Sequence, residues 1–256
     1  MRSLNYDVVV VGGGHAGCEA ALASARMNKK TLLITMSIDR IGQMSCNPAI
    51  GGTAKGHLVK EIDALGGEMG AAIDKTGIQF RVLNKSKGPA IWSSRAQAYM
   101  DLYRSYMRKT LEDTPNLDIL QDTVASLIID NNAVVGVNTS LDQSVHSSCV
   151  ILTTGTFLNG LIHIGERRIT AGRAGEPASI ELAQALKDYG FQVGRMKTGT
   201  TPRLDARSID FSKLERQDSD PDFVPFSMRT KEMNQKLVLS FFYNFLESKC
   251  FSKFQH

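Results

Sequence analysis

The chain has 256 residues, of which 42% are apolar and 22% are charged, and its net charge is +4. This length supplies one large domain or two small ones, and the composition is that of a globular protein rather than a disordered or fibrous one. The apolar runs are too short for a membrane span, and the first residues lack the apolar core of a signal peptide. The four cysteines lack CxxC spacing, which excludes a disulfide scaffold and a cysteine zinc site. We therefore expect a reduced, cytoplasmic protein with no metal and no membrane partner.

The N-terminal segment predicts a dinucleotide site. Residues 8–11 form a continuous apolar run, typical of a strand buried on both faces, and residues 16–27 have a helical, alanine-rich pattern. A second strand is expected over residues 31–35. Between the first strand and the helix the glycines have G-x-G-x-x-G spacing, which allows a tight turn, close approach of a diphosphate and close packing of helix on strand. The predicted phosphate-binding residues are Gly12, Gly13, Gly14, His15, Ala16 and Gly17. An ordinary glycine-rich turn is the alternative.

Four side chains near this turn carry further expectations. An acidic residue that binds a ribose hydroxyl usually ends the second strand, but Thr35 stands there and the next acid is Asp39. We expect the ring of His15 to be solvated, so that only its backbone matters. Cys18 is expected to be a small buried apolar residue rather than a reactive thiol.

A second cysteine, Cys46, lies in a glycine-rich loop over residues 42–57, which has neither a helical nor a strand pattern. A thiolate is a nucleophile, and positive charge nearby favours it, for which Lys55 and His57 are the candidates by sequence proximity. Cys46 is therefore predicted either to be a catalytic nucleophile or to be a buried structural cysteine.

The region from residue 40 to 109 is basic. It contains eleven Lys or Arg residues against five acids, and Lys85, Lys87 and Arg95 surround Trp92 in the sequence. Such a cluster fits a nucleic-acid surface that holds phosphates and stacks a base. The alternative, which we favour slightly, is a solvated face with a buried tryptophan.

Residues 123–153 predict a β-meander with turns at residues 131–132 and 141–143 and a last strand over 149–153. The strand leads into a Thr-Gly step at Gly155. This arrangement resembles two-domain flavoproteins, and the resemblance favours FAD over NAD at the first site and places Val124 at the adenine. An unrelated meander is the alternative.

A helix is expected to start near Pro177 and to stop at Gly190, with Ser179 close to its first turn. The loop over residues 197–205 contacts flavin or substrate, or is a plain turn. The role of a further glycine pair, Gly172 and Gly175, is open.

Four stretches together resemble one family: GGGHAGCEAALASARM, IGQMSCNPAIGGTAKGHLVKEIDALGG, VLNKSKGPAIW, and GRAGEPAS followed by GRMKTGTTPRLDARSIDF. They are similar to the glucose-inhibited division protein A family over about residues 6–231. The resemblance implies an FAD-dependent enzyme that uses NADH and a reduced folate. With a GTPase partner it adds a carboxymethylaminomethyl or aminomethyl group to carbon 5 of a tRNA wobble uridine, as a homodimer. It also implies a flavin contact at Ser179 and a Cys46 loop beside the flavin, where Cys46 would act as a nucleophile or assist the flavin chemistry.

The expected fold class is α/β: a Rossmann-like FAD-binding domain of the two-dinucleotide-binding-domain type. We assign residues 1–232 to this domain, with the meander at 123–153 and an inserted segment beginning over 156–232. Residues 233–256 form a divergent aromatic tail without family resemblance. Tyr99, Thr201 and Met228 also differ from the family's usual residues.

Because family members are more than twice as long, we expect a truncated form. It would have an exposed sheet edge and uncovered apolar faces, bind FAD weakly and associate through its tail. Whether the chain alone is an enzyme stays open. The alternatives are a folate- and FAD-dependent tRNA uracil C5 methyltransferase and a non-catalytic flavin- or RNA-binding fragment.

Overall fold

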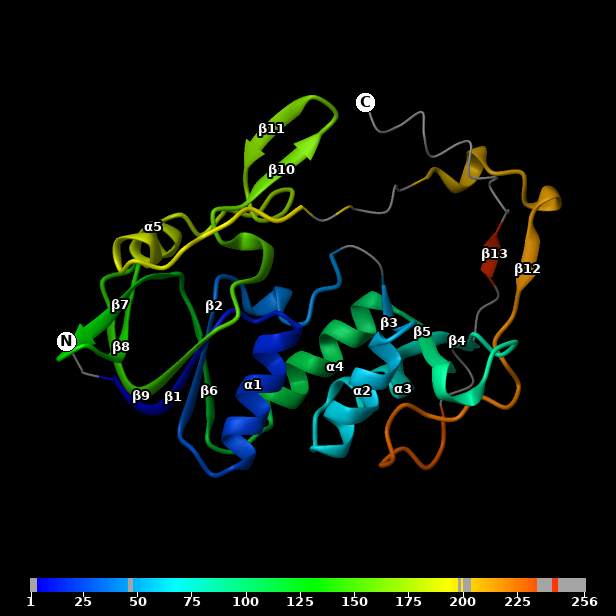
Figure 1. Ribbon diagram of the computed structural model, residues 1–256, viewed down its shortest axis with the longest axis horizontal. Coiled ribbons are helices and arrows are strands. Elements are labelled where there is room, and N and C mark those ends of the chain that lie inside the picture. Colours follow the sequence, from blue (N-terminus) through cyan, green and yellow to red (C-terminus); the bar gives the residue numbers. More distant parts are fainter. Residues whose placement is uncertain (1–3, 46–47, 198, 200–203, 234–240, 244–256) are drawn as a thin grey trace.

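The computed structural model describes residues 4–45, 48–197, 199, 204–233 and 241–243. Its largest element is a six-stranded sheet in the order β6-β2-β1-β9-β8-β7 (Figure 1). Four neighbouring strands run parallel: β6 (Leu117–Gln121), β2 (Thr31–Thr35), β1 (Leu4–Val11) and β9 (Ser144–Leu152). Helices α1 (His15–Arg26) and α4 (Met100–Glu112) pack against one face of this sheet. This is the Rossmann-like α/β fold that the sequence predicts.

Both faces of the parallel strands are buried, as the unbroken apolar run of β1 predicts. Val10 and Leu33 pack into the core beneath α1 and α4. Their neighbours Val9 and Leu32 belong to a second core on the opposite face, beneath α5 (Glu181–Asp188). Successive side chains of a strand point to opposite faces, and each such burial contributes about 1.5–3 kcal/mol.

The predicted meander is confirmed as β7 (Val124–Asp130), β8 (Ala133–Thr139) and β9. The first turn lies at Asn131 and Asn132, whose φ angles of 47° and 63° suit asparagine. The expected short last strand is the second half of a longer one. β8 pairs only with residues 144–146 of β9, whereas β1 pairs with β9 as far as Leu152. Among the described residues, no strand pairs with the second half of β9 on its side away from β1.

A second layer, which the sequence did not predict, begins within residues 42–57, where neither a helix nor a strand was expected. It holds an antiparallel sheet in the order β3-β5-β4 and two helices. These elements are β3 (Ala49–Gly51), β4 (Gly77–Leu83), β5 (Ser93–Ala98), α2 (Lys55–Ala64) and α3 (Met69–Thr76). Buried carboxylates of α2 and α3 tie a distant segment to this layer. Asp74 accepts the N–H groups of Phe226 and Ser227, each at 2.9 Å, and Asp63 accepts that of Met228 at 3.0 Å.

The described part of the inserted segment contains short strands, one α-helix and short 3-10 helices. The hairpin of β10 (Leu161–Ile164) and β11 (Arg167–Thr170) projects beyond α5 in Figure 1. The expected helix is α5, which begins at Glu181 rather than near Pro177, and Gly190 follows it with a φ of 88°. β12 (Glu215–Gln217) pairs with β13 (Phe241–Tyr243), which lies in the predicted tail.

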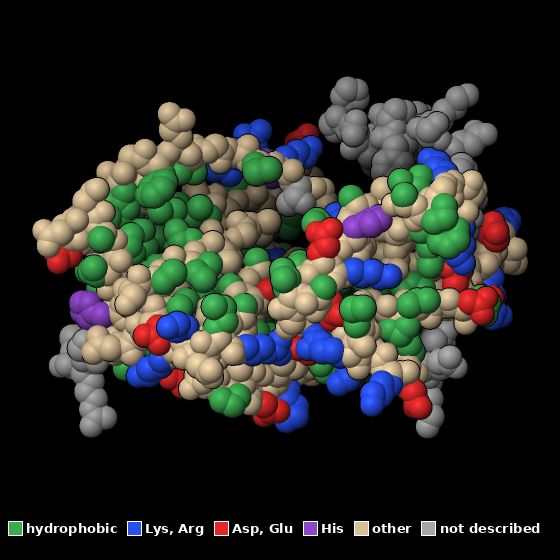
Figure 2. All heavy atoms as spheres, turned by 60° about the horizontal axis from the view of Figure 1, so that its bottom comes forward, with side chains coloured by type: hydrophobic (Ala, Val, Ile, Leu, Met, Phe, Trp, Pro, Cys, Tyr) green, Lys and Arg blue, Asp and Glu red, His purple; other side chains and the backbone are tan. Residues whose placement is uncertain are grey.

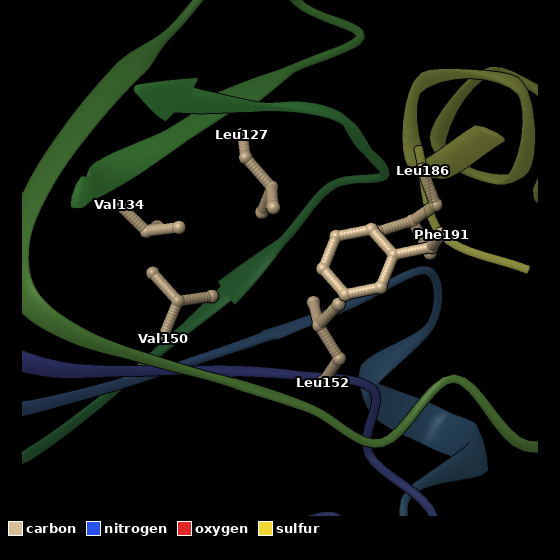
Figure 3. A pocket seen from close by; sticks show the side chains of 6 residues that line it. All are labelled: Leu127, Val134, Val150, Leu152, Leu186 and Phe191. Atoms are coloured by element: carbon tan, nitrogen blue, oxygen red, sulfur yellow. The ribbon is translucent and has the colours of Figure 1, made fainter. Parts of the chain in front are cut away.

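An apolar hollow of about 300 Å³ lies between the meander, β9 and α5 (Figure 3). Its lining residues are Leu127, Val134, Val150, Leu152, Leu186 and Phe191. Hydrophobic side chains also gather on the left of Figure 2, on the side of the molecule that holds the six-stranded sheet. Because a polar cofactor requires some polar groups in its site, this lining does not suit one. Among the described residues, this apolar sheet face is left partly open.

Candidate dinucleotide site

The glycine turn joins β1 to α1 at the carboxyl end of the parallel strands. Gly12 has a φ of 106°, and a β-carbon there would lie 2.6 Å from the carbonyl oxygen of Thr153. A β-carbon on Gly17 would collide with the carbonyl oxygen of Gly12, so this glycine allows the helix to pack on the turn. A β-carbon on Gly14, by contrast, would meet no atom of the described residues within 4 Å. The geometry of each glycine fits the role that the motif predicts for it.

Gly14 is also the N-cap of α1, and the N–H of Cys18 donates to its carbonyl at 2.9 Å. The N–H groups of the preceding turn, which includes His15, Ala16 and Gly17, therefore have no acceptor within the helix. The first turn contains no acidic residue. Free N–H groups and the positive end of the helix dipole thus face the open space beside Gly14, an arrangement that binds phosphate.

The ring of His15 is not solvated, contrary to expectation. It packs edge-on against Tyr103 of α4, with ring centroids 5.7 Å apart. Its Nδ1 is buried without a hydrogen-bond partner among the described residues, and burial lowers its pKa. Cys18 is buried as predicted, and burial raises the pKa of its thiol to about 12.

The end of β2 carries a threonine where a ribose-binding acid is usual. Thr35 is buried beside Gly13, whose β-carbon would lie 2.8 Å from the Thr35 hydroxyl oxygen. The next acid, Asp39, forms an ion pair with Arg108 at 2.6 Å. The N–H of Asp122 donates to the Thr35 carbonyl at 3.0 Å, which brings the start of β7 to this edge. Val124, the predicted adenine contact, is buried two residues further on.

The end of β9 completes this edge. The Thr153 hydroxyl donates to the carbonyls of Val11 at 2.8 Å and Gly12 at 3.0 Å. Gly155 follows with a φ of 54°. Ser179 is buried, but no helix turn positions it: its N–H donates to the Phe157 carbonyl at 2.8 Å, and its own carbonyl accepts from Asn159 at 2.8 Å. The structure therefore brings the predicted cofactor residues together near the carboxyl ends of the parallel strands. The role of Thr153 was not predicted, although the Thr-Gly step that follows it was noted.

The catalytic candidate Cys46 lies outside the described residues. The first residue of the segment that carries it contacts the glycine turn: the N–H of Gly42 donates to the carbonyl of Gly13 at 2.9 Å. Lys55 and His57, its proposed activators, lie exposed on the first turn of α2. Of the polar loop over residues 197–205, the structure describes only residues 197, 199, 204 and 205.

The basic cluster around Trp92 is partly neutralised. Lys85 forms an ion pair with Asp220 at 2.8 Å, and the indole N–H of Trp92 donates to the Lys87 carbonyl at 2.9 Å. Trp92 is 45% exposed, so it is not the buried tryptophan of the preferred interpretation. Over the face of the molecule drawn in Figure 2, cationic and acidic side chains are interspersed rather than segregated.

Two further findings concern only the described part of the chain. Within it, no helix has the length and hydropathy needed to cross a bilayer. No three His, Cys, Asp or Glu side chains of those residues come together as metal ligands.

Comparison with known proteins identifies the family. The model of the family glucose inhibited division protein A matches residues 7–253, and so includes most of the tail, where no resemblance was expected. The tRNA uridine 5-carboxymethylaminomethyl modification enzyme MnmG of Campylobacter fetus is 59% identical over 232 residues, 91% of this chain and 37% of that enzyme. The enzyme of the same name from Nitratiruptor sp. is 61% identical over 227 residues, 89% of this chain and 36% of its own. The chain thus spans little more than a third of these relatives.

Solved structures agree with this assignment. Aquifex aeolicus GidA superposes with a TM-score of 0.86 at 55% identity, over 89% of this chain and 38% of that one. The GidA-related protein from Thermus thermophilus, with a TM-score of 0.53 at 23% identity over 73% of this chain and 69% of that one, shares the fold. By sequence and by structure, the chain belongs to the glucose inhibited division protein A family.

Proposed function

We propose that this chain binds FAD at the front of α1 and forms the flavin-binding part of an enzyme that modifies tRNA uridine. The observation that carries the proposal is the glycine turn: Gly12 and Gly17 are needed for packing, whereas Gly14 leaves open space in front of free N–H groups. The diphosphate fits at residues 12–17, the adenine end at Val124, and further contacts at Gly155 and Ser179. When bound, FAD supplies redox chemistry at its flavin ring.

The reaction is the addition of a carboxymethylaminomethyl or aminomethyl group to carbon 5 of a tRNA wobble uridine. Family membership and the names of the relatives support it. NADH, a reduced folate, a GTPase partner and homodimer formation complete the proposal, and all four come from the family resemblance. We place the activity in the cytoplasm, where tRNA is found.

Cys46 is proposed as the nucleophile of this reaction. A pyrimidine becomes reactive at carbon 5 when a nucleophile adds to carbon 6, and a thiolate does so well. Support comes from the attachment of its loop to Gly13 beside the glycine turn. The exposed Lys55 and His57, on the first turn of α2, supply positive charge at the end of the same segment.

Two experiments test these proposals separately. Titration of the purified chain with FAD, followed by flavin fluorescence, tests the cofactor site; no change at any concentration excludes it. Mass spectrometry of tRNA nucleosides from a strain that lacks the family enzyme, with and without this chain, tests the activity. Restored modified uridine supports it, a 5-methyluridine product indicates the methyltransferase alternative, and FAD binding without any product identifies a non-catalytic fragment. Cys46→Ser with full activity removes the nucleophile assignment.

A further inference from the structure

Arg173 has an unusual environment at the same sheet edge. Its Nε and Nη1 atoms are buried, yet neither has a hydrogen-bond partner among the described residues. The side chain is 24% exposed, and its guanidinium carbon lies 5.2 Å above the ring of Phe157. Buried donors are nearly always hydrogen-bonded, because leaving one without an acceptor costs about 1–3 kcal/mol, so two such donors on one guanidinium call for a ligand.

The carboxylate that pairs with Arg173 is shared with a second arginine. Glu176 lies 3.6 Å from Arg173 Nε and 3.7 Å from Arg40 Nε, so both distances exceed those of a good hydrogen bond. One carboxylate neutralises only one of the two guanidinium groups, so the cluster of Arg173, Arg40 and Glu176 has a net charge of +1. Burial and the charge of Arg40 lower the pKa of Arg173, and Glu176 opposes this only in part.

A backbone hydrogen bond and two neighbouring glycines fix the position of Arg173. The N–H of Glu176 donates to the Arg173 carbonyl at 2.9 Å, and Gly175 supplies the turn with a φ of 79°. Gly172 packs so closely on Phe157 that any β-carbon would enter its ring. The glycine pair of the sequence thus holds an arginine in place.

The second arginine is tied to the dinucleotide site. Arg40 follows β2, two residues before Gly42, which donates to the Gly13 carbonyl. Phe157 follows β9 and Gly155. A planar guanidinium with two free N–H groups matches the geometry of a phosphate. Burial favours a small ligand that inserts along the sheet edge over the backbone of a folded RNA.

We propose that Arg173, assisted by Arg40, is an anion site for a phosphate of the dinucleotide bound at the glycine turn. This inference rests on the proposed function for the source of the phosphate, but not for the site itself. Glu176 holds the two arginines when no ligand is bound, and a phosphate takes over part of that pairing.

The test compares Arg173→Ala with Arg173→Lys and with Arg167→Ala, a control in the exposed hairpin. Scanning calorimetry with inorganic pyrophosphate is expected to raise Tm in the unaltered chain and the control, and clearly less in Arg173→Ala. Without ligand, Arg173→Ala loses the 3.6 Å ion pair with Glu176 and the contact with Phe157, so the rise in Tm is compared with each variant's own unliganded Tm. A rise with pyrophosphate in Arg173→Ala equal to that of the unaltered chain, or no rise in the unaltered chain, overturns the site.

Titrations with FAD and with riboflavin, which has no phosphate, identify the source. Arg173→Ala should weaken FAD binding at least about tenfold and leave riboflavin binding unchanged, and Arg173→Lys should fall between. If the pyrophosphate effect is present and FAD affinity does not change, the dinucleotide is not the source. If the unaltered chain does not bind FAD, the proposed function fails and the pyrophosphate result alone decides the anion site.

Discussion

The hydroxyl of Thr153 donates to the carbonyl of Gly12 at 3.0 Å, so the end of β9 is bonded directly to the turn after β1. This contact leaves no room for a side chain at Gly12, since a β-carbon would lie 2.6 Å from the Thr153 carbonyl oxygen. The open space for a ligand lies two residues further, at Gly14.

Gly12→Ala and Gly14→Ala should therefore have different effects. Gly12→Ala forces a side chain into a left-handed conformation and a collision, so it should lower the free energy of unfolding by about 1–3 kcal/mol and abolish FAD binding. Gly14→Ala should leave stability unchanged and weaken FAD binding at least about tenfold, because its methyl group occupies the diphosphate position. Urea unfolding and flavin titration measure both, with Gly88→Ala as the control at another open position. Equal losses of stability at the two glycines would contradict this division of roles.

Burial of His15 predicts a loss of stability in mild acid. Its pKa in the folded chain is lowered from 6.5, so between the two pKa values the unfolded chain binds more protons. The stabilisation is present above pH 6.5 and is lost as the pH falls, by up to about 1.4 kcal/mol per pH unit. His15→Phe keeps the ring packing against Tyr103 but does not titrate, so its urea midpoint should fall less between pH 7.5 and 5.5.

The matched control for this titration is His163→Gln in the exposed hairpin, which should follow the unaltered chain at every pH. A His15→Phe profile that parallels the unaltered chain would show that the imidazole is not protected from protonation.

Asp63 should be a main support of the second layer. Its buried carboxylate accepts the Met228 N–H and pairs with Arg229 at 3.2 Å. Burial alone would raise its pKa, but hydrogen bonds from Ser227, Met228 and Arg229 more than offset this, so the pKa is lowered from 3.8. Asp63→Ala should lower the free energy of unfolding by about 2–3 kcal/mol at pH 7, because partners of a buried charge are left unsatisfied.

The pH dependence of that difference gives a second measurement. A group with a lowered folded pKa stabilises above its unfolded pKa and loses this contribution as the pH falls through the folded one. The gap between Asp63→Ala and the unaltered chain should therefore narrow below about pH 4. Asp113→Ala, which breaks an exposed pair with Lys109, should have no measurable effect. A constant gap from pH 7 to pH 3 would show that the charge of Asp63 is not involved.

The cysteines should differ in reactivity. Cys18 is buried with a pKa raised to about 12, whereas Cys149 is exposed. Iodoacetamide at pH 8 should alkylate Cys149 in the native chain and Cys18 only after unfolding, as read by peptide mass spectrometry. If Cys46 is an activated nucleophile, it should react faster than Cys149 and at lower pH. Labelling of Cys46 no faster than Cys149 would count against its catalytic assignment.

Local patterns predicted much of the nucleotide-binding half. The strand before Gly12, the spacing of Gly14 and Gly17, and the asparagine turn of the meander each depend on a few adjacent residues. The glycine and asparagine positions among them require a positive φ or the absence of a side chain, and these residue types meet those requirements. The same reasoning places the burial of Cys18, because a helix packed on a strand leaves no solvent there.

Features that join distant segments were beyond such reasoning. Asp74 and Phe226 are 152 positions apart, and no local pattern in either segment predicts the hydrogen bond between them. His15 was expected to be solvated because the sequence does not show that Tyr103 of α4 would cover it. The sequence flagged Gly172 and Gly175 but not the arginine between them, since the burial of Arg173 depends on Phe157 from another element.

The shared strand β9 couples two parts of the molecule mechanically. Its first residues pair with β8, nearly its whole length pairs with β1, and Thr153 directly after it is bonded to the turn at Gly12. A change of register in the meander would therefore move the far end of β9 by about 3.3 Å for each residue of shift. This displacement would reach the cofactor loop, roughly 20 Å away along the strand. Insertions at the Asn131–Asn132 tip leave that register intact, so tags or reporter sequences can be placed there. Deletions within β9 would change the register and should be avoided.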